Sequence, residues 1–226
     1  MPNYDHLIVA IDGPAGAGKS TVAKRLAAIL KCAYLDTGAM YRALTLKALR
    51  EKINLEDEKS LVTLAQRTKI DLEDEGRNLR VFLDGQDVSK EIRSAEVTNN
   101  TFYIARAPKV REIMVRWQQD IGKRKSLIVE GRDVTTVVFP KATYKFYLDA
   151  NLDERSHRRL KELKEKGNAV DASKLKKEIH ERDNCDLKRE VGALKKAQDA
   201  IYIDSTHLNL DEVVEQVMKH IKVNHG

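Results

Sequence analysis

The stretch that decides the fold is LIVAIDGPAGAGKS, residues 7–20. Residues 7–11 form an apolar run rich in β-formers that ends at Asp12, which predicts a short buried strand of a parallel sheet. Residues 19–31 follow with apolar side chains at helical spacing. The segment between them fits the phosphate-binding pattern G-x4-G-K-[ST], in the strand–loop–helix context that this pattern requires. A chance glycine-rich turn is the alternative, and the context argues against it.

The chemistry of such a loop points to a nucleoside triphosphate. Its glycines let backbone N–H groups converge on phosphate oxygens, and the following helix adds the partial positive charge of its N-terminus. We expect Lys19 to reach the β- and γ-phosphates and Ser20 to ligate Mg²⁺. The loop alone does not distinguish a GTPase, a motor and a kinase.

The remainder of the chain alternates short apolar strands with helical patterns. Further strands are predicted at 33–36, 127–130, 144–148 and 201–204. Helices are predicted at 19–31, 110–119, 153–166, 174–190 and 210–222, and another is expected to begin at Thr37, which can cap it. This alternation predicts an α/β, three-layer fold around a five-stranded parallel sheet.

One stretch interrupts the alternation of strands and helices and predicts a small antiparallel insert. Residues 69–73, 79–83 and 86–88 resemble short strands, and Asp84-Gly85 is a strong two-residue hairpin signal. We expect no repeats and no linker that would divide the chain into independent domains.

Composition places the chain among globular proteins with one sizeable core. It has 226 residues and a formal net charge of +6, with most of the basic excess between residues 154 and 196. That excess is compatible with nucleic acid, membrane headgroups, a small polyanion or a merely solvated helical face. It lacks the aromatic residues that interleave with basic ones in nucleic-acid platforms. Two distant cysteines and six scattered histidines suggest free thiols in a reducing cytosol and no metal site of His or Cys.

Three further motifs carry side chains suited to phosphate chemistry. LDTGAMYR (35–42) begins where a strand ends, although a simple helix start with a surface arginine explains it equally well. EGRD (130–133) follows a strand directly, and such positions face the ligand crevice of a parallel sheet. ERDNCDLKR (181–189) places Arg182, Asp186 and Arg189 on one helical face, and three more arginines cluster at 155–159. Salt-bridged solvated helices are the alternative, but arginines that neutralise a transferring phosphoryl group fit better.

Taken in order, these motifs resemble bacterial cytidylate kinases, nucleoside monophosphate kinases of the P-loop superfamily. The resemblance rests on IDGPAGAGKST, YLDTGAMYRAL, DGQDVSKEIR, EGRDVTTVVFP, HRRLKELKEKG and ERDNCDLKR, and it covers nearly the whole chain. It implies Mg²⁺-dependent transfer of the ATP γ-phosphoryl group to CMP or dCMP. It also implies a core of residues 1–63, 96–151 and 190–226, a nucleotide-monophosphate-binding insert at 64–95, and a helical lid at 152–189.

The resemblance also assigns residues to each substrate. Implied for the ATP phosphates are Gly13, Pro14, Ala15, Gly16, Ala17, Gly18, Lys19, Ser20 and Thr21. The residues implied for the acceptor phosphate are Arg42, Arg132 and Arg189, beside Thr37 and Tyr41. The sugar is implied to bind Arg182 and Asp186, and the base to bind Arg111 and Asp133, with Thr101 nearby. Arg158 and Arg159 belong to the implied lid, and Asp36 is the candidate to orient Mg²⁺ through water.

Three positions depart from the family pattern. Phe102 stands where a small hydroxyl residue helps to read the base, so Thr101 would substitute or base discrimination would weaken. Thr135 replaces an expected glycine, and Lys141 an expected acidic residue.

Other acceptors remain open at this point, UMP and AMP among them, as does a P-loop regulatory or nucleic-acid-binding module. We expect a cytoplasmic monomer that binds small nucleotides, with neither nucleic acid nor membrane as a partner. The sequence does not settle the preference between CMP and dCMP.

Overall fold

A five-stranded parallel sheet organises the chain, with strands in the order β2-β6-β1-β7-β8. The structure is a computed structural model, and it describes residues 6–74, 79–165, 167 and 170–223. The strands are β1 (Ile8–Asp12), β2 (Ala33–Asp36), β6 (Leu127–Gly131), β7 (Tyr144–Asp149) and β8 (Ile201–Asp204). All four pairings are parallel, so the predicted sheet is confirmed.

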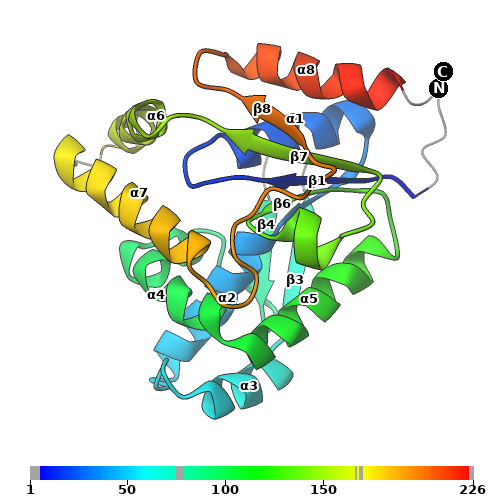
Figure 1. Cartoon of the computed structure of the whole chain (residues 1–226). Coiled ribbons are helices and arrows are strands. Elements are labelled where there is room, and N and C mark those ends of the chain that lie inside the picture. Colours follow the sequence, from blue (N-terminus) through cyan, green and yellow to red (C-terminus); the bar gives the residue numbers. More distant parts are fainter. Residues whose placement is uncertain (1–5, 75–78, 166, 168–169, 224–226) are drawn as a thin grey trace.

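Helices cover both faces of this sheet (Figure 1). Helices α1 (Lys19–Leu30) and α8 (Leu210–Val223) lie on one face, and α2 (Thr37–Arg50) and α5 (Pro108–Gly122) lie on the other. Strand β1 shows why: Val9 and Ile11 pack in the apolar cluster that contains α1 and α8, while Ala10 packs in the cluster that contains α5. Alternate residues of a strand point to opposite faces, so a fully apolar strand requires cover on both.

The predicted antiparallel insert is present as a three-stranded sheet of β3 (Ile70–Asp74), β4 (Leu79–Leu83) and β5 (Gln86–Asp87). Asp84 and Gly85 connect β4 to β5 with positive φ angles of 50° and 85°, as a two-residue hairpin turn requires. Val81 and Leu83 on β4 belong to the same apolar cluster as β1. The small sheet therefore packs directly against the core.

The helix predictions were partly wrong. Helix α1 ends at Leu30 because Lys31 takes the left-handed conformation, and α7 (Ala172–Leu187) ends before Arg189. Helix α6 (Leu152–Glu165) begins one residue early, and the predicted last residue, 166, lies outside the described residues. The N-cap of α2 is Asp36, whose carboxylate accepts the Ala39 amide; the predicted cap, Thr37, is the first helical residue.

Several elements had no counterpart in the prediction. They are α3 (Glu58–Gln66), α4 (Ala95–Arg106), a 3-10 turn at Glu91–Arg93 and a π-helical turn at Val134–Val138. Helix α4 begins at the capping residue Ser94, which accepts the Val97 amide, and α3 is capped in the same way by Asp57. No helix in the described part of the chain is both long and apolar enough to span a membrane.

Strand order brings the predicted motifs to one edge of the sheet. Asp12, where β1 leads into the phosphate-binding loop, is in register with Gly131, and Asp36 at the end of β2 is in register with Glu130. Helices α6 and α7 stand at one end of the molecule as a pair (Figure 1, left). The loop, the start of α2 and the turn after β6 therefore meet at the carboxyl ends of adjacent strands, where ligands bind in such sheets.

Candidate active site

The phosphate-binding loop has the geometry that its sequence predicts. Gly16 and Gly18 have φ angles of 79° and 89°, in the left-handed region that favours glycine, and α1 begins directly afterwards at Lys19. Lys19 is buried, and its ammonium group donates to the Pro14 carbonyl oxygen at 2.7 Å. Burial, reinforced by the nearby positive charge of Arg132, lowers the pKa of Lys19 to about 7. An anionic phosphate at this position would reverse that effect.

Ser20 directs its hydroxyl to a carboxylate that the sequence analysis did not assign. The Ser20 hydroxyl donates to Glu130 at 2.6 Å, and the Tyr34 hydroxyl donates to the same oxygen at 3.2 Å. Glu130 is the residue before the last one of β6, and its backbone carbonyl accepts from the Thr37 hydroxyl at 2.8 Å. The EGRD motif contained the signal, because Glu130 is its only carboxylate that lies within the strand. Asp36, the predicted partner of Mg²⁺, pairs with Arg42 at 2.9 Å.

The donor set around Ser20 fits a magnesium ion. A hydroxyl and a carboxylate are hard oxygen ligands, the type that Mg²⁺ prefers. Among the described residues, no group of three or more His, Cys, Asp or Glu side chains is arranged to hold a metal by itself.

Three of the four arginines predicted for the acceptor phosphate and sugar gather around Asp186, whereas Arg42 pairs with Asp36. The Asp186 carboxylate accepts from Arg132 at 2.7 Å and also pairs with Arg189. Burial would raise the pKa of Asp186, but Arg132, Arg189 and Arg182 together hold it below its ordinary value. Arg182 itself is exposed to solvent, but the protein atoms crowded around its guanidinium group and the charge of Arg132 lower its pKa to about 10. Positive charge is therefore in excess here, which favours an anionic ligand.

Buried donors without partners mark where such a ligand would lie. Within the described residues, the Tyr41 hydroxyl, Arg42 Nε and Arg189 Nε are buried and find no hydrogen-bond partner. Burial raises the pKa of Tyr41 to about 12, so its hydroxyl keeps its proton. Buried polar groups are nearly always satisfied in folded proteins. Orphaned donors beside an arginine cluster therefore fit an anion with several oxygens.

The predicted base-reading pair is assembled and almost wholly buried. Arg111 on α5 forms an ion pair with Asp133, and its side chain is 2% exposed. It also donates to the Ala105 carbonyl at 3.1 Å and lies 5.5 Å from the centre of the Tyr41 ring. Gly192, with a φ angle of 68°, approaches so closely that a Cβ there would overlap both Arg111 and Asp133. The segment after α7 thus packs directly against this pair.

Thr101 and Phe102 lie on α4 and make local contacts. The Thr101 hydroxyl donates to the Val97 carbonyl at 2.7 Å and lies 3.5 Å from the Thr45 hydroxyl. The Phe102 ring contacts Tyr103 edge to face, and Arg106 stacks over it at 5.1 Å.

Asp12 holds the turn that presents Arg132 and Asp133, and sequence reasoning missed it. Its carboxylate accepts from the Val134 amide at 2.9 Å and from the Thr135 amide and hydroxyl at 2.7 Å each. Burial raises the pKa of Asp12 to about 6. Thr135, noted for replacing a glycine, therefore supplies an additional hydrogen bond from its side chain.

The two arginines predicted for the lid occupy different surroundings. Arg158 donates to the Ser205 hydroxyl at 3.0 Å and to its carbonyl at 2.5 Å, and it would lie 3.9 Å from a Cβ at Gly18. Arg159 pairs with Glu162 at 2.6 Å and is 41% exposed. Arg158 is therefore beside the phosphate-binding loop, whereas Arg159 faces solvent.

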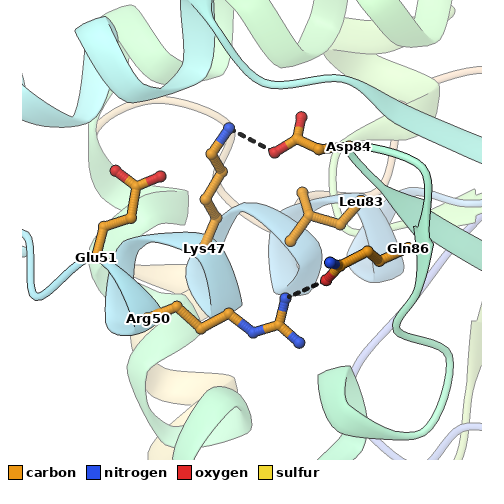
Figure 2. A pocket seen from close by; sticks show the side chains of 6 residues that line it. All are labelled: Lys47, Arg50, Glu51, Leu83, Asp84 and Gln86. Carbon is orange, nitrogen blue, oxygen red and sulfur yellow. Dashed lines mark hydrogen bonds and ion pairs between the residues drawn. The ribbon is translucent and has the colours of Figure 1, made fainter.

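A cavity of about 220 Å³ lies elsewhere, between the end of α2 and the β4–β5 hairpin (Figure 2). Lys47 pairs there with Asp84 at 2.6 Å, and Arg50 donates to the Gln86 side chain at 3.4 Å. Because these basic groups already have partners within the chain, we assign the cavity no role in the site.

Comparison with known proteins agrees with this geometry. The family model described as cytidylate kinase matches residues 9–223. The chain is 50% identical over 218 residues to a cytidylate kinase of Desulforamulus reducens, covering 96% of this chain and 98% of that protein. It is also 50% identical over 216 residues to one of Caldanaerobacter subterraneus subsp. tengcongensis, covering 96% and 95%. The chain therefore belongs to the cytidylate kinase family and is a phosphotransferase.

Proposed function

We propose that the enzyme transfers the γ-phosphoryl group of ATP to CMP or dCMP, producing ADP and CDP or dCDP. The observation that carries this proposal is the set of buried, unpartnered donors on Tyr41, Arg42 and Arg189, beside an arginine cluster, at the strand edge that also carries the phosphate-binding loop. A loop for one phosphate chain and a second anion site at the same edge suit transfer between two nucleotides.

On the donor side, the backbone of residues 13–21 would hold the ATP phosphates, and Lys19 would neutralise the β- and γ-phosphates. Ser20 and Glu130 would hold Mg²⁺, and Asp36 would contribute through water. When bound, the ion neutralises charge that develops on the transferring phosphoryl group. Arg158, beside Gly18, would add positive charge from α6, and Arg159 of the same helix is proposed to act with it.

On the acceptor side, Arg42, Arg132 and Arg189 would bind the phosphate of CMP, with Thr37 and Tyr41 beside it. An oxygen of that phosphate attacks the γ-phosphorus, a new P–O bond forms, and the bond to the β–γ bridging oxygen breaks with release of ADP. The attacking group is already an anion, so no general base is required.

Recognition of the nucleoside would depend on two carboxylates. Arg182 and Asp186 would bind the sugar hydroxyls. Asp133, oriented by Arg111, would accept from the exocyclic amine of cytosine, and Thr101 would complete the pocket. Uracil presents a carbonyl oxygen at the corresponding position, so a carboxylate discriminates against UMP.

We further propose that small nucleotides are the enzyme's only ligands and that it acts as a cytoplasmic monomer. Several cations of the basic stretch at 154–196 pair with carboxylates of the chain, which favours a solvated face over a polyanion-binding surface. These pairs join Arg158 to Glu154, Arg159 to Glu162, and Lys176 to Asp153.

Arg132→Ala tests the acceptor assignment. We expect loss of most CDP formation while ATP still binds, measured by coupled ADP release and by ATP titration. Arg116→Ala is the matched control, because Arg116 is an exposed arginine on α5 whose Nε donates to the Glu112 carbonyl of its own helix. Unchanged CDP formation by Arg132→Ala would refute the role given to Arg132.

A further inference from the structure

Helices α6 and α7 share a small apolar core with the phosphate-binding loop. Leu175 and Ile179 on α7 pack with Ala15 of the loop, and Leu160 and Leu163 on α6 pack against them. The methyl group of Ala15 is therefore part of the core that holds the two helices together. Gly16 extends the contact, since a Cβ there would lie 3.1 Å from Arg155 Cβ.

Two buried side chains bind the backbone of the same loop residue. The Ala15 amide donates to the Asp183 carboxylate at 3.0 Å, and Arg155 donates to the Ala15 carbonyl at 2.8 Å. Arg155 and Asp183 also form an ion pair with each other, and Arg155 Nε donates to the Ala150 carbonyl at 2.8 Å. Both polar groups of the Ala15 backbone are thus satisfied by α6 and α7.

Moving α6 and α7 away from the phosphate-binding loop would cost considerable free energy. Arg155 and Asp183 are less than one-tenth exposed, so their pairing takes place where the effective dielectric constant is low. Removing one partner of a buried ion pair leaves an uncompensated charge, which is strongly unfavourable. A displacement of α6 and α7 away from the loop would break the bonds to both Ala15 groups at once, while the methyl group of Ala15 would lose its apolar contacts.

We propose that Arg155 and Asp183 are positioning residues, and that through them the conformation of the phosphate-binding loop depends on the position of α6 and α7. Because Asp183 takes the Ala15 amide, the loop conformation that presents its other amides to phosphate exists only when α7 is docked. ATP binding is then coupled to the ordering of α6 and α7. This inference rests on the proposed function in that ATP is taken as the ligand of the loop.

The test compares Asp183→Asn with Glu181→Gln in the full chain. Glu181 is a matched control, because it undergoes the same carboxylate-to-amide change on the same helix but is exposed and forms an ion pair with Lys177 at 3.8 Å. Binding of Mg·ATP is measured without acceptor, followed by KM for ATP, KM for CMP and kcat. Loss of one charge-assisted hydrogen bond predicts a rise of about tenfold in the ATP dissociation constant and KM. We expect KM for CMP to stay within twofold.

Hydrogen exchange distinguishes coupling between ATP binding and the docking of α6 and α7 from a purely structural role of the ion pair. ATP should slow exchange in α6 and α7 of the wild-type protein and of Glu181→Gln, and this protection should be lost in Asp183→Asn. If Asp183→Asn does not fold, Arg155→Lys serves instead, since it keeps the positive charge but cannot reach Ala150, Ala15 and Asp183 together.

The proposal would be overturned if Asp183→Asn had lower thermal stability but wild-type ATP affinity and wild-type exchange protection of α6 and α7. The ion pair would then contribute only to the stability of the fold. Wild-type ATP binding without turnover of CMP would instead count against the proposed function.

Discussion

Lys19 provides a prediction that can be worked out quantitatively. Its pKa is lowered to about 7 by burial and by the charge of Arg132, so at pH 8 the side chain is about 90% neutral in the free protein. Phosphates of ATP placed against it would return the pKa towards its ordinary value of 10.5. Binding of ATP at pH 8 is therefore expected to take up about 0.9 proton per site.

The assay is calorimetric titration of Mg·ATP in buffers that differ in ionisation enthalpy, where the slope of apparent enthalpy gives the protons taken up. Lys19→Arg is the decisive variant, because arginine keeps its charge at this pH and should bind ATP with no proton uptake. Uptake below about 0.2 proton in the wild type, or equal uptake in Lys19→Arg, would refute the assignment.

The lowered pKa of Lys19 also determines how its contribution to folding stability changes with pH. Since the unfolded chain binds more protons than the folded one between pH 7 and 10.5, the contribution of Lys19 to stability rises with pH across this window.

Three further predictions concern carboxylates at the site. Asp133→Asn should lower the CMP-to-UMP ratio of kcat/KM by about 10- to 100-fold, since an amide can donate to uracil and one base contact contributes about 1–3 kcal/mol; an unchanged ratio would remove Asp133 from base recognition. Glu130→Gln should raise the Mg²⁺ concentration needed for half-maximal turnover while CMP affinity stays constant, and an unshifted Mg²⁺ profile would contradict the role of Glu130. Asp12 has its pKa raised to about 6 by burial, so its contribution to folding stability is greatest below pH 4 and is lost as pH rises to 6, by about 3 kcal/mol. Denaturant titrations should show this loss as the difference between wild type and Asp12→Asn, and equal pH slopes for the two would contradict it.

Local patterns in the sequence predicted the sheet and the phosphate-binding loop. The strands β1, β2 and β6 are short runs of mostly buried residues, whereas the edge strand β8 leaves Tyr202 exposed. The loop joins β1 to α1 by glycines at positive φ angles. The hairpin at Asp84-Gly85 was predictable for the same reason, since two consecutive residues there require positive φ angles. Signals that lie within about ten residues of chain were therefore sufficient for these elements.

Contacts between distant residues account for what the sequence did not reveal. Asp12 receives its hydrogen bonds from Val134 and Thr135, and Asp183 receives one from Ala15. No local pattern marks either carboxylate, because each is satisfied by a backbone group more than one hundred residues away. The π-helical turn at Val134–Val138 is of the same kind, since the Asp12 carboxylate holds its first two amides.

The most direct test of the account is the acceptor preference of the purified wild-type enzyme. ADP release with Mg·ATP would be measured against CMP, dCMP, UMP, AMP and GMP in turn. We expect strong turnover with CMP and dCMP and weak turnover with the other three, because in the proposed function Asp133, oriented by Arg111, accepts from the cytosine amine. Comparable turnover of UMP would contradict the role of this pair in base selection, and no turnover with any acceptor would contradict the proposed reaction.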